Sequence, residues 1–209
     1  MFATRADAGR RLADALEHLG DEGVVVLGVA RGGVEVAAEV ARSRGWPLDV
    51  VIPRKVGAPF NPELGLGAIA PGVRVLDEAM LRSLEVTEEY LDREIAKQEE
   101  EIERRAAAYR KGRPPVDLEG KTAVIVDDGL ATGGTAVAAV RWARRSGAER
   151  VVLAVPVAPS EAVAKLSEEA DEVVVLATPE PFYAVGQWYG EFTQTRDGDV
   201  VRLLERAAG

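Results

Sequence analysis

Apolar and β-branched residues gather into five short runs along the chain, and each run has the length of one strand. The runs are nearly continuous rather than alternating, which is typical of strands that are covered on both faces. They are Gly23–Val29, Leu48–Pro53, Thr122–Asp127, Arg150–Pro156 and Glu172–Ala177.

Helical periodicity fills several of the intervals between these runs, at Val34–Arg44, Thr135–Ser146 and Ser160–Ala170. Strands that alternate with helices of this length favour right-handed βαβ units and a parallel sheet. The sequence therefore predicts an α/β fold: a doubly wound, mainly parallel sheet with helices on both faces. We find no repeat or linker and expect one domain over 1–209, with its core at about 23–177.

Two segments interrupt this rhythm and predict an elaboration at about 54–112. Residues 54–78 are rich in Gly and Pro, and Leu64–Ile69 is a candidate hairpin partner of Val73–Leu76. Residues 87–111 form one long helical pattern, with Thr87 as the expected N-cap and Gly112 as the expected end.

The long helix carries a narrow apolar stripe on an otherwise charged surface. We expect i,i+4 ion pairs between Glu100 and Arg104 and between Glu101 and Arg105. The stripe predicts a mostly solvated helix that docks one seam on the body or on a partner subunit. The stripe residues are Leu91, Ile95, Ile102, Ala106 and Tyr109.

Composition removes several classes of function. The chain has no cysteine and one histidine, His18, which excludes disulfides and thiolate chemistry and disfavours a zinc site. A net charge of −9 disfavours nucleic-acid binding through a general field, although local amides and a few basic residues can still bind a small anion. No apolar run can span a bilayer and no signal peptide is evident, so we expect a cytoplasmic protein without a membrane partner.

The main candidate for chemistry is the segment from Val124 to Thr135, which reads VIVDDGLATGGT. Asp127 and Asp128 close a predicted central strand, and a helix is expected to begin at Thr135. Small residues between them would let successive backbone N–H groups, together with the helix N-terminus, surround a phosphate. Two adjacent carboxylates fit a ribose diol or a divalent cation held through water. The alternative is an acidic strand end followed by a Gly-rich turn of no special purpose.

This segment resembles the signature of the type I phosphoribosyltransferases, in which two acids at a strand end precede a loop that ends in Thr-Gly-x-Thr or Thr-Gly-x-Ser. The resemblance implies that Asp127 and Asp128 hold the 2- and 3-hydroxyls of a ribose and take part in binding Mg²⁺ through water. It also implies a 5-phosphate site made by Ala131, Thr132, Gly133, Gly134 and Thr135. Hypoxanthine-type members have an Asp at the position of Ala131, so an acid or base acting on the nucleobase would have to come from elsewhere here.

The segment Gly28–Gly33 follows the first strand and matches the place of the family's pyrophosphate loop. There Gly32 and Gly33 would allow close backbone approach, while Arg31 would form a fork to phosphate oxygens. A plain turn before a helix would have the same letters.

Basic groups after the second strand are candidates for a catalytic loop. Family members have a flexible loop near here that closes over the site, and the resemblance extends this role to Arg54 and Lys55. A surface pair is the competing interpretation. Glu63 is a candidate acid or base, with a solvated carboxylate as the favoured interpretation.

The C-terminal part, about 178–209, is expected to form the variable hood that recognises the base in the family. Phe182, Trp188 or Tyr189 could stack on a base whose edge is read by Gln187, or the rings could fill a small core. His18 lies away from every motif and is interpreted as structural or surface-exposed.

Together these features predict an Mg²⁺-dependent enzyme that transfers a phosphoribosyl group from phosphoribosyl pyrophosphate to a nitrogenous base. The catalytic candidates are Asp127, Asp128, Arg31 and Lys55. The alternative is a regulatory protein that binds the same ligand, or a nucleotide, without turnover. The resemblance also implies a homodimer.

Overall fold

The computed structural model describes residues 1–20 and 22–208, and its centre is a sheet of five parallel strands. The strand order is β2-β1-β6-β7-β8, which confirms the predicted parallel α/β fold. The five strands coincide with the five apolar runs: β1 (Val24–Val29), β2 (Leu48–Val51), β6 (Thr122–Val126), β7 (Arg150–Val157) and β8 (Glu172–Ala177).

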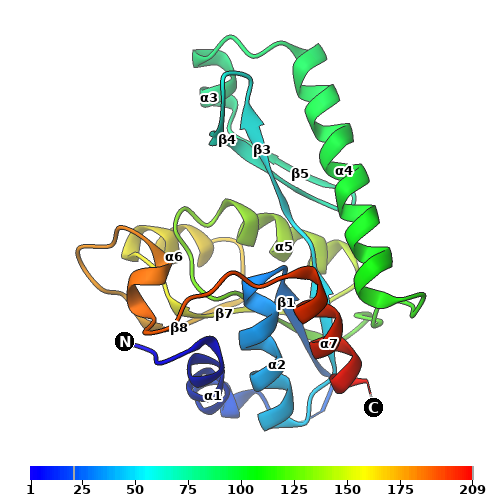
Figure 1. The fold of residues 1–209 in the computed structure, drawn as a ribbon, viewed down its shortest axis with the longest axis vertical. Coiled ribbons are helices and arrows are strands. Elements are labelled where there is room, and N and C mark those ends of the chain that lie inside the picture. Colours follow the sequence, from blue (N-terminus) through cyan, green and yellow to red (C-terminus); the bar gives the residue numbers. More distant parts are fainter. Residues whose placement is uncertain (21, 209) are drawn as a thin grey trace.

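Helices cover both faces of this sheet (Figure 1). One layer contains α1 (Arg5–Ala15), α2 (Gly32–Arg44) and α7 (Asp197–Ala207), and the other contains α5 (Gly134–Arg145) and α6 (Ser160–Leu166). The alternation of side chains along β1 separates the two cores. Val24 and Val26 pack in the cluster that includes α1 and α2 residues, whereas Val25 and Leu27 pack in the cluster that includes α5 residues.

The winding direction of the sheet reverses between β1 and β6. From β1 the chain moves to β2 on one side, and the later strands β6, β7 and β8 follow on the other. In open parallel sheets, ligands bind outside the carboxyl ends of the strands at such a switch point. Here that location lies after Val29 and Val126, the last residues of the two strands.

The segment between β2 and β6 forms an arm that projects from the body (Figure 1). Its antiparallel sheet consists of β3 (Arg54–Ala58), β4 (Asn61–Ala70) and β5 (Val73–Leu76), followed by α3 (Glu78–Ser83) and α4 (Glu88–Arg110). The predicted hairpin is confirmed as β4 and β5, and β3 is an additional strand. Arg54 and Lys55 therefore lie in a strand, not in the expected loop, because β3 pairs with β4 along its whole length.

Helix α4 docks one seam on the rest of the chain, as its narrow apolar stripe predicted. Ile95, Ile102 and Tyr109 are buried, and the side chain of Thr87 caps the first turn by accepting from Tyr90 N. The helix ends at Arg110, because Lys111 already adopts a left-handed conformation, so the predicted helical pattern, 87–111, ran one residue too far at this end.

One of the two predicted ion pairs on α4 was wrong. Arg105 contacts Glu101 at 2.6 Å, as expected, but Arg104 also contacts Glu101, at 2.7 Å, instead of Glu100. The reason lies in the tertiary structure, since Arg104 is drawn toward Asp197 at the start of α7, 3.7 Å away.

The expected hood at 178–209 divides into two parts. Residues 182–189, which include a 3-10 turn at Val185–Trp188, pack with the N-terminus, where Phe2 N donates to Trp188 O at 2.7 Å. Helix α7 instead joins the body, because Val200 and Leu204 enter the main core cluster.

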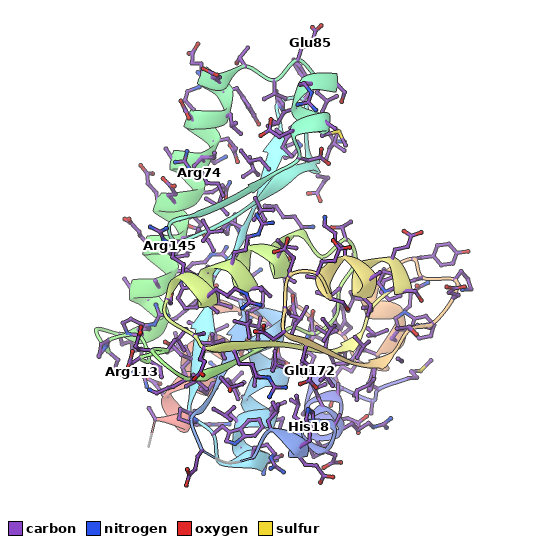
Figure 2. All side chains as sticks on the ribbon, turned by 180° about the vertical axis from the view of Figure 1, so that it is seen from behind. His18, Arg74, Glu85, Arg113, Arg145 and Glu172 are labelled. Carbon is purple, nitrogen blue, oxygen red and sulfur yellow. The ribbon has the colours of Figure 1, made fainter. Side chains whose placement is uncertain are left out.

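His18 lies in a short 3-10 turn, Glu17–Leu19, and its Nε2 contacts Glu172 Oε1 at 2.8 Å. Figure 2 shows the two side chains near each other in the part of the body that lies away from the arm. The expectation of a structural or surface histidine is confirmed. Within the described residues, no helix is long and apolar enough to cross a membrane.

Gly28 permits the close contact between β1 and α2. A Cβ at this position would lie 2.7 Å from Val34 Cα and 3.0 Å from Ala37 Cβ. We expect Gly28→Ala to lower the free energy of unfolding by about 1–3 kcal/mol, because the helix must shift away from the sheet. Denaturant unfolding measures this.

The matched control is Gly134→Ala at the start of α5, where a Cβ would meet no heavy atom within 4 Å. This variant should be as stable as the original chain or slightly more stable, since alanine favours a helix. Equal unfolding midpoints for Gly28→Ala and the original chain would refute the packing account.

Candidate functional site

The start of α2 lies directly against the acidic end of β6. A Cβ on Gly32 would lie 2.0 Å from Asp128 Oδ2, and one on Gly33 would lie 2.6 Å from Val126 O. Neither position can therefore hold a side chain without moving the strand end or the carboxylate. The two glycines after Arg31 allow the start of α2 to lie against the Asp128 carboxylate and the backbone of β6. The close approach of this loop to a pyrophosphate, which the sequence predicted, stays a prediction. The Ala30–Arg31 peptide bond is cis.

Asp127 and Asp128 emerge together at the carboxyl end of β6, as predicted. Asp127 Oδ1 accepts the backbone N–H of Asp128 at 2.8 Å. Asp128 Oδ2 accepts from Arg5 Nε at 2.7 Å, and the hydroxyl of Tyr189 donates to Asp128 O at 2.5 Å. A bond from α1 thus holds the carboxylate of Asp128, and a bond from the hood segment holds its backbone oxygen, while Asp127 Oδ1 is tied to its neighbour's backbone.

Burial disfavours the charged form of both acids. It raises the pKa of Asp127 well above its usual range, and the neighbouring charge of Asp128 raises it further. Burial also raises the pKa of Asp128, although the guanidinium of Arg5 opposes this shift. The pair is therefore costly in the free protein and is suited to a ligand that donates hydrogen bonds or positive charge.

The loop after the acidic pair leads into α5, which begins at Gly134, one residue before the expected start. Gly133 is the N-cap, in a left-handed conformation with φ 76°. Ala131 and Thr132 are exposed, and Thr135 lies in the first turn. The uncapped N–H groups of a helix start attract anions, so this loop has the form of a phosphate site.

A cavity of about 460 Å³ opens beside the acidic pair. Its residues come from α1, the loop after β1, β3, α4, the end of β6 and the segment before α7. They are Arg5, Ala30, Arg31, Gly32, Arg54, Arg105, Asp128, Phe192, Thr193, Gln194 and Thr195. Four arginines in one cavity make a local positive field in a chain whose net charge is −9.

Three of these arginines have carboxylate partners. Arg5 contacts Asp128 at 2.7 Å, Arg105 contacts Glu101 at 2.6 Å, and Arg31 contacts Asp197 at 3.6 Å. Arg54 differs, because its Nε donates to the neutral amide oxygen of Gln98 at 2.8 Å.

Arg54 is held in an environment that disfavours its charge. Burial lowers the pKa of Arg54, and the positive charges of Arg105 and Arg31 act in the same direction. Among the described residues, no carboxylate lies within salt-bridge distance of its guanidinium. An anion in the cavity would therefore relieve the repulsion among these three arginines.

Lys55, the neighbour of Arg54, is exposed and is not among the cavity residues. Successive side chains of a strand point to opposite faces, so pairing of β3 with β4 separates the two cations. The catalytic role expected for Lys55 stays a prediction. Glu63 is exposed, as expected for a solvated carboxylate.

The aromatic residues of the hood mainly pack on one another. Trp188 stacks on Phe182 with ring centroids 6.3 Å apart, and Tyr189 is buried against Phe2. Gln187 Oε1 accepts from the backbone N–H groups of Tyr183 and Ala184, so this oxygen is engaged within its own turn. Base stacking by Trp188 stays a prediction, and the packing of a small core is observed.

Sequence reasoning missed Arg5 and Arg105 among the cavity residues, and also the segment from Phe192 to Thr195. Arg5 lies on the first helix and Arg105 on a highly charged one, where nothing local separates them from solvated residues. In the sequence, only the hydrophobic stripe of α4 indicated which side of that helix packs on the rest of the chain.

The site offers few ligands to a metal ion by itself. Within the described part of the chain, no group of three or more His, Asp or Glu side chains is suitably arranged. The two carboxylates fit a hard cation that takes most of its oxygens from water and from a bound phosphorylated ligand.

The doubly wound sheet has an acidic pair at its switch point, followed by a glycine-rich loop, and an arginine-lined cavity beside it. This arrangement is suited to a small anionic ligand. The model of the phosphoribosyl transferase domain matches residues 3–183. The chain belongs to this family.

A Mycobacterium tuberculosis protein with a provisional phosphoribosyl transferase name is 53% identical over 208 residues, covering 99% of this chain and 47% of that protein. The chain thus spans about half the length of this relative. A uracil phosphoribosyltransferase from Nocardioides sp. is 32% identical over 81% of this chain and 72% of its own length. The crystal structure of TT1426 from Thermus thermophilus is similar with a TM-score of 0.84 and 48% identity, covering 100% of this chain and 99% of that chain.

Asp127→Asn should stabilise the free protein at neutral pH. Because the pKa of Asp127 is higher in the folded than in the unfolded chain, the folded state binds more protons and loses stability as pH rises through that interval. We expect the thermal midpoint at pH 7 to rise by at least about 2 °C. The gain should shrink as pH falls toward the ordinary carboxyl range.

Asp92→Asn on α4 removes the same charge from an exposed position and serves as the control. It should change the midpoint little at either pH. A lower midpoint for Asp127→Asn at pH 7 would contradict the account of a costly buried pair.

Proposed function

We propose that the protein transfers a 5-phosphoribosyl group from phosphoribosyl pyrophosphate to a nitrogen atom of a base and releases pyrophosphate. In this reaction the bond from ribose C1 to a pyrophosphate oxygen breaks, a bond from C1 to nitrogen forms, and the base loses one proton. The observation that carries the proposal is the cavity of four arginines, which reaches Asp128 of the acidic pair; the proposed phosphate loop follows this pair in the chain. A donor with a pyrophosphate, a ribose diol and a 5-phosphate matches these three parts in that order.

Each part of the donor has a group of suitable chemistry. The loop from Ala131 to Thr135 offers backbone N–H groups to the 5-phosphate, and Asp127 and Asp128 accept hydrogen bonds from the ribose hydroxyls. Pyrophosphate fits the cavity, where Arg31 and Arg54 can form charge-assisted bonds to its oxygens.

The chemistry asks mainly for stabilisation of charge on the leaving group. As the C1–O bond breaks, negative charge grows on pyrophosphate while the ribose becomes positive. Fixed guanidinium groups in a partly buried cavity stabilise the negative charge on pyrophosphate, and the adjacent carboxylates stabilise the positive charge on the ribose. Arg54 is well placed, because it is already held by Gln98 and needs little rearrangement.

Mg²⁺ is the proposed cofactor, and Asp127 and Asp128 would hold it through water. When bound, the cation would neutralise part of the charge on pyrophosphate. Asp128 keeps its contact with Arg5, so Asp127 offers the less engaged carboxylate.

The acceptor is proposed only as a nitrogenous base. Ala131 supplies no acid or base, and the oxygen of Gln187 is engaged in its own turn. The relative named uracil phosphoribosyltransferase makes uracil the first base to test.

The test is pyrophosphate release from phosphoribosyl pyrophosphate with Mg²⁺ and a panel of bases that includes uracil. We expect release with at least one base and a loss of about 100-fold or more in Asp128→Asn, since one of two ribose-binding carboxylates is lost. Donor binding without release from any base would instead identify a sensor of the same ligand. No donor binding would overturn both functions.

Arg54 and Lys55 provide a matched pair of neighbouring cations. Arg54→Gln should weaken pyrophosphate binding about tenfold or more, because it removes the cavity cation that lacks a carboxylate partner among the described residues. Lys55→Gln should leave this affinity within about twofold, since its side chain is outside the cavity. Calorimetric titration with Mg²⁺ and pyrophosphate measures both, and a larger loss in Lys55→Gln would reverse the assignment.

A further inference from the structure

Arg5 makes three contacts at the acidic pair although it comes from the first helix. Its Nε donates to Asp128 Oδ2 at 2.7 Å, its Nη1 donates to Thr193 O at 2.7 Å, and its Cζ lies 3.9 Å from the centroid of the Phe192 ring. Only 7% of its side chain is exposed. These contacts hold the Arg5 guanidinium in one position in the cavity.

The start of α1 explains why Arg5 is so well placed. Thr4 caps the helix by accepting from Asp7 N at 3.2 Å, so Arg5 occupies the first helical position. Gly32 passes beside it, since a Cβ there would lie 3.1 Å from Arg5 Nε. The helix cap, the glycine loop and the hood segment together determine where this guanidinium lies.

The contact with Arg5 fixes the orientation of the Asp128 carboxylate. Oδ2 is engaged with Arg5, and the backbone oxygen of Asp128 is held by Tyr189. The remaining carboxylate oxygen is then presented in a defined direction. Without Arg5, the Asp128 side chain would be free to turn, and its negative charge would lose the one cation that the described residues place within hydrogen-bond distance.

We infer that Arg5 is a positioning residue, which holds Asp128 in the orientation that recognises a hydroxyl of the donor's ribose. This inference rests on the proposed function, because it assigns the acidic pair to the ribose. Arg5 acts through Asp128, and its effect depends on the hydroxyls of the ligand rather than on the ligand's charge.

This role differs from that of the other cavity arginines. Arg54 and Arg31 line the cavity and would contact a bound anion directly, so removing either should weaken the binding of all anions of the same charge to a similar extent. Removal of Arg5 should most strongly weaken the binding of a ligand whose hydroxyl donates a hydrogen bond to Asp128. Comparing ligands that have the same charge but differ by one hydroxyl separates the effect of charge from the effect of the hydroxyl contact.

The experiment compares ribose 5-phosphate with its 2-deoxy and 3-deoxy analogues by calorimetric titration. The original chain should prefer ribose 5-phosphate over at least one analogue by about tenfold or more, which is the usual size of a hydrogen bond to a charged group. In Arg5→Gln that preference should fall to about twofold or less. The deoxy analogue itself should lose much less affinity than ribose 5-phosphate.

Arg10→Gln is the matched control, since Arg10 lies on the same helix with an exposed side chain. It should keep the full preference. Arg5→Lys retains the charge but lacks the rigid guanidinium fork that reaches Asp128 and Thr193 together, so it should lose most of the preference too. Thermal unfolding without ligand establishes that each variant is folded, and Arg5→Lys carries the test if Arg5→Gln does not fold.

An equal loss of affinity for all three sugar phosphates in Arg5→Gln would overturn the inference, because Arg5 would then act by charge alone. Unchanged affinities would overturn it as well. Failure of the proposed function has a different signature. In that case the original chain itself would bind ribose 5-phosphate no better than its deoxy analogues.

Discussion

The close approach of the α2 N-terminus to the carboxyl end of β6 is the constraint on which the site depends. There is no room for a Cβ on Gly32 beside the Asp128 carboxylate, nor for one on Gly33 beside the backbone of Val126, so the start of the helix lies directly against the strand end. This contact places Arg31 and the acidic pair at one point of the sheet. It also encloses the two carboxylates, and their burial raises the pKa of each.

Compensation for this buried negative charge comes from remote parts of the chain. Arg5 arrives from α1, and the hood segment contributes the hydroxyl of Tyr189 to the backbone of Asp128. The N-terminus is held to the hood by Phe2 N donating to Trp188 O. The first helix and the hood are therefore parts of the candidate site as well as covers of the sheet.

The arm supplies the opposite kind of charge. Arg54 from β3 and Arg105 from α4 approach Arg31, and their mutual repulsion is only partly balanced by Glu101 and Asp197. Tyr109 helps to hold this arrangement, since its hydroxyl donates to Asp197 at 2.7 Å; burial, with that hydrogen bond, raises the pKa of Tyr109 to about 12. An ordered strand and a docked helix thus present fixed cations where a mobile loop was expected, so less ordering is required when an anion binds.

The sequence by itself determined the parallel sheet, the acidic strand end and the glycine-rich turn into α5, because each depends on local patterns of burial, turn and helix start. The tertiary structure alone decided that Arg5 and Arg105 reach the cavity, that Arg54 faces it while Lys55 lies outside, and that Arg104 contacts Glu101 and Asp197 instead of Glu100. These outcomes depend on strand pairing and on residues far apart in the chain. A charged side chain on a helix has the same local signature whether it faces water or a ligand.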